Sequence, residues 1–138
     1  MSPVELKLQL FTQCLDFVNQ RIGFAKQAMD GAQESANQEE KSSAGDKYET
    51  GRAMAQLERD KAAAQVSEAQ KMLSVLAQLK KIAPSQKVAL GSVVITDRNK
   101  YYLSISAGKL AIEDASYLAI SAQSPIGQLL LNNQNRNW

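Results

Sequence analysis

Histidine is absent from this chain of 138 residues, and cysteine occurs once, at Cys14. Without histidine, Ser-His-Asp and Cys-His catalysis and histidine-ligated zinc are excluded. One thiol forms neither an internal disulfide nor a cysteine-rich metal site, which is typical of a reducing compartment. No apolar run approaches the ~20 residues that span a bilayer, and Met1 to Leu10 lack the apolar core of a signal peptide. We therefore expect a cytoplasmic protein without a membrane segment.

Proline is scarce, and none occurs between Pro3 and Pro84. That interval is therefore open to long helices. Hydrophobic residues make up 44% of the chain, which is enough for a modest core. The formal net charge is +2, and we expect no direct sequence-specific binding to DNA.

Apolar residues in the first part of the chain recur at alternating steps of four and three. The stripe contains Val4, Leu8, Phe11, Leu15, Val18, Ile22, Ala25 and Met29, with Ala32 and Ala36 in the same register. This heptad spacing predicts one helix from about residue 3 to 41, with a seam like that of a coiled coil.

A second apolar stripe follows a break in the periodicity. Two serines and a glycine in the segment from Lys41 to Asp46 predict a turn. The later stripe contains Met54, Leu57, Ala62, Val66, Ala69, Leu73, Leu76, Leu79 and Ile82. Pro84 ends this helix. Two long helices joined by a short turn predict an antiparallel coiled-coil hairpin over residues 1–83, in which every stripe residue packs in the core.

The sequence pattern of the remaining residues, 84–138, is typical of a small β-rich domain. Short β-prone runs lie at Val88 to Ile95, Lys100 to Ile105, Leu110 to Ile112 and Tyr117 to Ile120, separated by turn residues. Ser124 as N-cap and Pro125 as first helical residue predict a final short helix. From Asn132 onward, we expect a frayed polar tail. The predicted fold class is therefore α+β.

Three local matches give this order of elements a resemblance to the bacterial GreA/GreB transcription elongation factors. The segment Ser121 to Leu130 resembles the family's "S-x-x-SP-[IL]-[GA]-x-[AL]-L". Val88 to Val94 resembles its "V-x-x-G-[SA]-x-V". Gly45 to Glu49 is similar to its hairpin tip, "GD-x-x-E".

The resemblance implies a divergent Gre-like member with an FKBP-like C-terminal domain. It implies that the hairpin enters the secondary channel of RNA polymerase, where Asp46, helped by Glu49, stabilises a Mg²⁺ ion shared with the polymerase active site. The polymerase would then cleave its own backtracked RNA, so this chain would not itself be an enzyme and would meet the RNA 3′ end only indirectly. Partner-binding candidates are Lys47, Tyr48, Ser124, Pro125 and Ile126; no cofactor of its own is implied.

The residues themselves add a charge pattern and an alternative interpretation of the tip. Between Asp30 and Glu49 lie six acids and two bases, a formal charge of −4, so the rest of the chain carries +6. Such a polarised surface would present its tip to cations and its body to anions. The spacing of Asp46 and Glu49 puts both on one helix face, but it equally fits an N-cap and its capping-box partner.

Three other functions remain open. Thr50, Gly51 and Arg52 follow Glu49, where the family usually has a further acid, which favours a channel binder that no longer stimulates cleavage. A coiled-coil structural adaptor would use the hairpin as a docking surface. An independent enzyme is the weakest alternative, because no nucleophile constellation is present.

Overall fold

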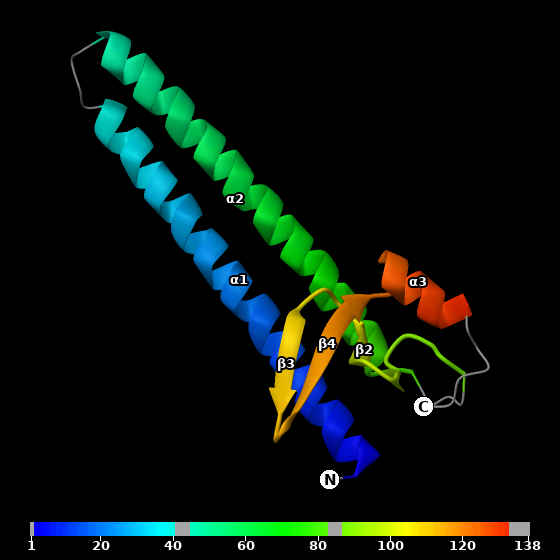
Figure 1. The fold of residues 1–138 in the computed structure, drawn as a ribbon. Coiled ribbons are helices and arrows are strands. Elements are labelled where there is room, and N and C mark those ends of the chain that lie inside the picture. The colour runs from blue at the N-terminus through cyan, green and yellow to red at the C-terminus, as the bar shows by residue number, and fades with distance from the viewer. Residues whose placement is uncertain (1, 41–44, 83–86, 133–138) are drawn as a thin grey trace. The chain divides into compact units, whose positions relative to one another are not determined.

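The structure is a computed structural model that describes residues 2–40, 45–82 and 87–132, with side chains in these ranges except at residues 36, 38–40 and 45–49. Over these residues it contains two long helices, α1 (Pro3–Glu40) and α2 (Gly45–Leu79), and a short helix, α3 (Pro125–Asn132). Four strands lie between α2 and α3: β1 (Val93–Ile95), β2 (Lys100–Ser104), β3 (Gly108–Ile112) and β4 (Ala115–Ser121) (Figure 1). This content confirms the predicted α+β class.

The chain divides into two compact units. The helical unit is Asn19–Lys71, and the mixed unit combines Met1–Val18 with Met72–Trp138. The mixed unit thus contains the start of α1 and the end of α2 as well as the sheet and α3. The boundary predicted between residues 83 and 84 stays a prediction, since residues 83–86 lie outside the described part of the chain.

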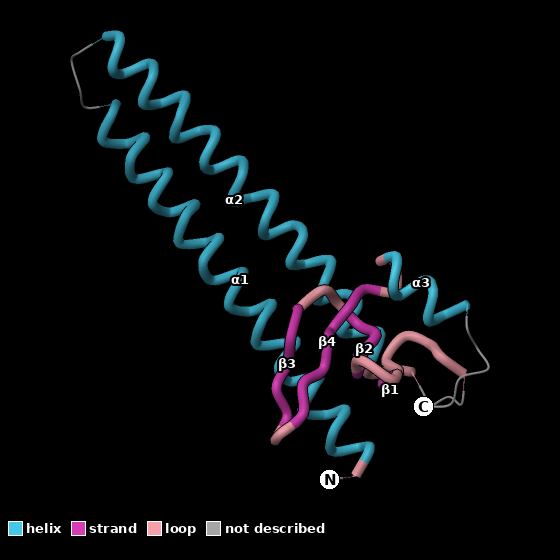
Figure 2. The backbone as a smooth tube through the Cα atoms, in the orientation of Figure 1, coloured by secondary structure: helices cyan, strands magenta, loops and turns pink. Residues whose placement is uncertain are grey.

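Alanine forms the seam of the helical unit, in which the two helical segments lie side by side and run in opposite directions (Figures 1 and 2). The buried residues of the unit are Ala25 and Ala32 on α1 and Ala55, Ala62 and Ala69 on α2. They recur every seven residues, which keeps them on one stripe of each helix. Because alanine has almost no side chain, the two backbones can approach closely along this stripe.

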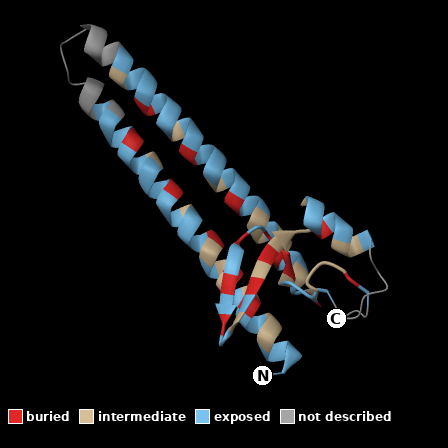
Figure 3. Ribbon diagram, viewed as in Figure 1, coloured by how far each residue is buried: buried red, intermediate tan, exposed pale blue. Residues whose placement is uncertain are grey.

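Five residues of the predicted apolar stripes are exposed, so the prediction that every stripe residue packs in the core is wrong for them. They are Val4, Leu8, Met54, Leu57 and Ile82. On α2 the reason is a shift of register. Ala55, not the larger Met54, occupies the buried position seven residues before Ala62, which leaves Met54 59% exposed. Figure 3 shows the buried positions recurring along both helices.

The sheet of the mixed unit is four-stranded, in the order β1-β2-β4-β3. β1 and β2 pair antiparallel, as do β3 and β4, whereas β2 and β4 are parallel neighbours, with Tyr102 opposite Ala119. Both strands of the central pair are half-buried or buried along most of their length. The parallel pair makes the sheet mixed.

The two faces of this sheet have different cores. On one face, Val88, Val94 and Leu103 form a cluster against which Leu130 and Leu131 of α3 pack. Side chains alternate between faces along a strand, so Tyr102 and Ser104 lie on the opposite face. There the Sγ atom of Cys14 on α1 contacts the Ser104 hydroxyl, and Gln13 donates a hydrogen bond to the carbonyl oxygen of Ala111 at 2.8 Å.

Several element boundaries differ from the predicted ones, and β3 and β4 each begin two residues early, at Gly108 and Ala115. α2 ends at Leu79, three residues before Ile82, the last residue of the predicted stripe. The chain continues as a turn in which the backbone N–H of Lys81 donates to the carbonyl of Gln78. The predicted strand from Val88 begins only at Val93, because Gly91 adopts φ +90 within a turn. Of the turn predicted from Lys41 to Asp46, Gly45 and Asp46 already belong to α2, and Asn132, predicted as the first frayed residue, is the last residue of α3. Residues 41–44 and 133–138 lie outside the described part of the chain.

Candidate functional site

The tip predicted from the sequence lies at the start of α2. α1 ends at Glu40 and α2 begins at Gly45. Asp46, Lys47, Tyr48 and Glu49 therefore fall in its first turns, while their side chains lie outside the described part of the structure. The helical backbone at these positions puts Asp46 and Glu49 on one face of α2.

The helix start bears on the capping interpretation of Asp46. An N-cap residue precedes the first helical residue, but Gly45 already belongs to α2, so Asp46 lies inside the helix. The interpretation of Asp46 as the N-cap of α2 is therefore wrong. A carboxylate in the first turn still interacts favourably with the positive end of the helix dipole.

The Ser124–Gly127 segment builds the start of α3. The backbone N–H of Gly127 donates to the Ser124 hydroxyl at 3.0 Å, and the same hydroxyl donates to the carbonyl of Ser121 at 2.7 Å. Ser124 is thus the N-cap, and Pro125 is the first helical residue, as the sequence predicts.

Gly127 is buried and has no room for a side chain. A Cβ atom built there would overlap the Ser121 carbonyl oxygen and approach Ser124 Oγ. Of the three residues proposed here as partner contacts, Ser124 uses its hydroxyl internally, while Pro125 and Ile126 are exposed. Leu129, one helical turn beyond Ile126, is 69% exposed. The free apolar surface of α3 is therefore carried by Ile126 and Leu129.

The second matched segment, Val88 to Val94, is also explained by packing. Its two end residues belong to the cluster under α3. Between them, Ser92 accepts a hydrogen bond from the N–H of Ala89, and a Cβ atom at Gly91 would lie 3.2 Å from a methyl of Leu79. The glycine is required both by its positive φ and by this close approach.

Basic residues along the two long helices are candidate contacts for anions: Lys7, Arg21, Lys26, Arg52, Arg59, Lys61 and Lys71. Lys80 and Lys81 directly follow α2, where they could equally act as a charge pair at its C-terminal end. Arg59 donates to Gln33 on α1 and to Gln56 on its own helix. Lys71 pairs with Glu68 at 3.2 Å, and the Lys80 ammonium lies 5.5 Å from the centre of the Phe11 ring. These contacts give Arg59, Lys71 and Lys80 structural roles on the helices.

Cys14 makes a buried polar contact that sequence reasoning missed. Burial raises the pKa of the Cys14 thiol above its ordinary value, and the hydrogen bond to Ser104 offsets this in part. Burial, followed by the nearby Cys14, raises the pKa of Tyr102 as well. A thiol held neutral is a poor nucleophile, so Cys14 is a structural residue.

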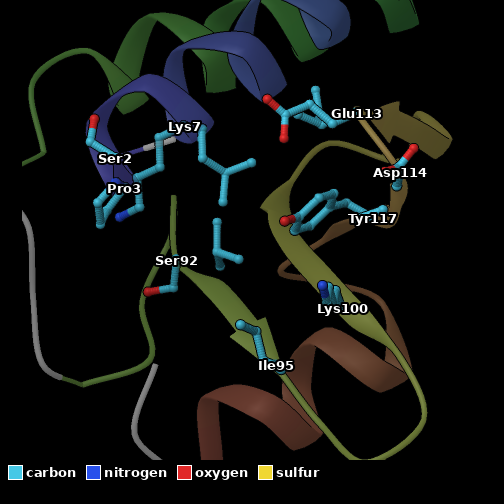
Figure 4. A pocket seen from close by; sticks show the side chains of 13 residues that line it. Ser2, Pro3, Lys7, Ser92, Ile95, Lys100, Glu113, Asp114 and Tyr117 are labelled. Atoms are coloured by element: carbon cyan, nitrogen blue, oxygen red, sulfur yellow. The ribbon is translucent and has the colours of Figure 1, made fainter.

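A groove in the mixed unit was also missed. It has a volume of about 690 Å³ and lies between the first turns of α1 and one face of the sheet (Figure 4). Leu6, Val93, Ile112 and the Tyr117 ring give it apolar walls, and Lys7, Lys100, Glu113 and Asp114 stand at its margins. Glu113 and Asp114 occupy the turn between β3 and β4, where Glu113 adopts φ +54.

Within the described residues, no helix has the length and apolar character needed to span a bilayer, and no three acidic or cysteine side chains gather in a metal-binding group. The side chains of Asp46 and Glu49 lie outside that described part.

Comparison with known proteins adds no relative: no protein-family model, no curated protein and no solved structure matches this chain.

Proposed function

We propose that this chain is a Gre-like factor that binds RNA polymerase through the secondary channel and stimulates cleavage of backtracked RNA. One observation carries the proposal: Asp46 and Glu49 fall on one face of α2, directly after the break that separates it from α1. An acidic pair at that point is at the end of the helical unit rather than along its length. In this proposal the chain acts from the cytoplasm on the polymerase and is not itself an enzyme.

The heptad-spaced alanines support the finer description of α1 and α2 as an antiparallel coiled coil. A seam of small residues gives a thin pair of helices, a shape suited to entering a channel. The FKBP-like description of the C-terminal part belongs to the same proposal. It is supported by the mixed sheet with one helix packed on it, and by the Ser-Pro-Ile-Gly segment that caps α3.

Charge gives the proposed docking its direction. The region from Asp30 to Glu49 has a formal charge of −4, against +6 for the rest of the chain. An acidic end is attracted to a Mg²⁺-containing active site, and complementary charge raises the rate of association. Lys47 and Tyr48, which lie between the two acids in sequence, are the proposed contacts inside the channel, and Pro125 and Ile126 offer exposed contacts on α3.

The proposed chemistry at the tip uses carboxylate oxygen atoms. Asp and Glu supply the hard oxygen ligands that Mg²⁺ prefers. Asp46 would hold the second Mg²⁺ ion of the polymerase site, with Glu49 as its helper. The metal, when held there, supplies the activated water and the charge neutralisation that phosphodiester hydrolysis needs. No resident metal or cofactor is required by this proposal.

A channel binder without cleavage stimulation is the second candidate. It is favoured by Arg52, which places a base one helical turn after Glu49, where the positive charge weakens attraction for a cation. A structural adaptor is the third candidate, supported by the exposed apolar side chains Phe24, Met54 and Leu57 of the helical unit.

Binding to core RNA polymerase tests the proposal. We expect the full chain to be retained by immobilised core polymerase and to compete with other secondary-channel proteins. Retention should fall as salt rises, because charge complementarity contributes to docking. Ser116→Ala, at an exposed position on β4, serves as a folded control that should be retained as well as the wild type. Failure to bind core polymerase at low salt would reject both the cleavage-stimulating factor and the channel binder. A stable oligomer of this chain would then favour the structural adaptor.

A further inference from the structure

The groove of the mixed unit has the volume and the mixed apolar and charged lining of a ligand-binding site. Its volume of about 690 Å³ falls within the ~300–1,000 Å³ usual for ligand pockets. The apolar floor comes from three sources that are distant in sequence: Leu6 on α1, Val93 on β1, and Ile112 with Tyr117 on β3 and β4. Ile112 and Tyr117 are almost buried, at 4% and 7% exposure, whereas Ile95 at the rim of the groove is 49% exposed.

The walls carry charges of both signs, and on the sheet wall a further base, Lys100, has its ammonium 5.6 Å from the centre of the Tyr117 ring. Figure 4 shows Lys7 on the α1 wall, and Glu113 and Asp114 at the β3–β4 turn on the other wall. The Tyr117 hydroxyl points into the space between them. Within the described part of the chain, Lys7, Glu113 and Asp114 have no hydrogen-bond or ion-pair partner. Three charged groups around one apolar floor are thus available to a ligand.

The edge strand of the sheet borders the same groove. β1 pairs only with β2 among the described strands, and its residues Val93 and Ile95 both line the groove. An unpaired strand edge is a template for an extended chain, which gains main-chain hydrogen bonds there while its side chains enter the adjoining pocket.

We propose that this groove binds an extended apolar segment of a protein partner, flanked by an acidic residue that pairs with Lys7 and a basic residue that pairs with Glu113 and Asp114. The apolar side chains of the segment lie against Leu6, Ile112 and the Tyr117 ring. Both flanking charges are complementary to the wall that they meet, which selects for such a segment against one with two like charges. The proposal concerns only the mixed unit and does not depend on the polymerase or the tip.

The test uses blocked synthetic peptides, so that all charge resides on side chains. One peptide carries glutamate at one end of a Val-Leu-Val core and lysine at the other end. A second peptide carries lysine at both ends of the same core. Binding is followed by NMR titration of the ¹⁵N-labelled full chain. We expect the first peptide to bind about threefold more tightly, as one rim ion pair allows, with shifts centred on Val93, Ala115 and Tyr117.

A charge reversal makes the test specific. Lys7→Glu should invert the preference, so that the peptide with two lysines binds more tightly. The variant should fold, because Lys7 is only half-buried and makes no hydrogen bond or ion pair within the described part of the chain. Lys109→Glu is the matched control: Lys109 is exposed on β3 and does not line the groove, so that variant should keep the original preference.

Three results would overturn the proposal. One is an unchanged preference in Lys7→Glu, and another is a set of shifts that lies away from the groove. The third is equal binding of an unblocked Val-Leu-Val tripeptide, whose charges are its own termini. That outcome would assign the groove to a small zwitterion rather than to a segment of a protein.

Discussion

The Sγ atom of Cys14 on α1 lies 3.6 Å from the Oγ atom of Ser104 on β2, inside the core of the mixed unit. This contact joins residues 90 positions apart and ties the first helix to the centre of the sheet. Both side chains are buried, at 0% and 2% exposure. The pair is therefore a reporter of whether the helix and the sheet are packed together.

We predict that stability falls with alkaline pH through Cys14. Its pKa is raised in the folded state from an ordinary value of 9.0. A raised pKa contributes stability that is complete below the unfolded-state pKa and is lost as pH rises through the folded one. The unfolding free energy from urea titration should therefore fall between about pH 8 and pH 10.

Cys14→Ala isolates that contribution. The variant is less stable at neutral pH because burial is lost, but its decline above pH 8 should be shallower than that of the wild type. In the folded wild-type protein, a thiol reagent should modify Cys14 only slowly until urea is added. Parallel pH curves for the two proteins, or rapid native modification, would show that the thiol is not held neutral by burial.

A matched pair of glycine substitutions tests the start of α3. Gly127→Ala should destabilise the protein by about 2 kcal/mol or more, because the new methyl would overlap the Ser121 carbonyl. Gly23→Ala lies in α1 with no atom within 4 Å of the added Cβ, so it should stabilise by about 0.5–1 kcal/mol. Thermal unfolding of both variants decides the matter, and equal effects would refute the close approach at Gly127.

The alanine seam of the helical unit gives a third prediction. Ala62→Leu should destabilise by about 1–3 kcal/mol, because a large side chain forces the two helices apart. Its neighbour Ala63 is exposed, so Ala63→Leu should change stability by less than about 0.5 kcal/mol. Urea unfolding compares the two. If Ala63→Leu were the more harmful change, the register of the seam would be wrong.

Much of the fold was predictable from the sequence. The scarcity of proline and the seven-residue spacing placed α1 within one residue of its observed ends, and Ser124 with Pro125 marked the start of α3. The stripe predicted for α2 contained the buried Ala62 and Ala69, but at its start Met54 was chosen where Ala55 is buried. A hydrophobic pattern favours the larger of two adjacent apolar residues, even where the smaller one lies at the close helix contact. The strand from Val88 was overextended, since its glycine turn is set by packing against Leu79.

The two candidate sites differ in how far the sequence alone could point to them. The tip could be named from the sequence because its acids adjoin a break in the periodicity. The groove could not, since Lys7 and Asp114 are more than one hundred residues apart in sequence and are brought to the same groove only by the packing of α1 on the sheet. The exposed Val4 and Leu8 belong to the same helix start, and they line a second groove of the mixed unit together with Leu79 and Ala89.

Glu49 provides a graded prediction at the tip. Glu49→Gln removes the charge of the helper ligand and keeps its size, so stimulation of RNA cleavage should fall only in part, because water can replace a helper ligand. Raising the Mg²⁺ concentration should restore some of the loss by mass action. Initial cleavage rates at two Mg²⁺ concentrations measure both effects. A loss that is complete and insensitive to Mg²⁺ would assign Glu49 a role other than that of helper.

The rate of RNA cleavage in stalled, backtracked polymerase complexes tests the central proposal most directly. Wild-type protein should accelerate cleavage, and Asp46→Asn should abolish the acceleration while polymerase affinity stays nearly unchanged. The asparagine keeps the size of the side chain and removes the negative charge that holds Mg²⁺. Equal acceleration by both proteins would contradict the role of Asp46. Binding without acceleration by the wild type would contradict cleavage stimulation and leave a channel binder.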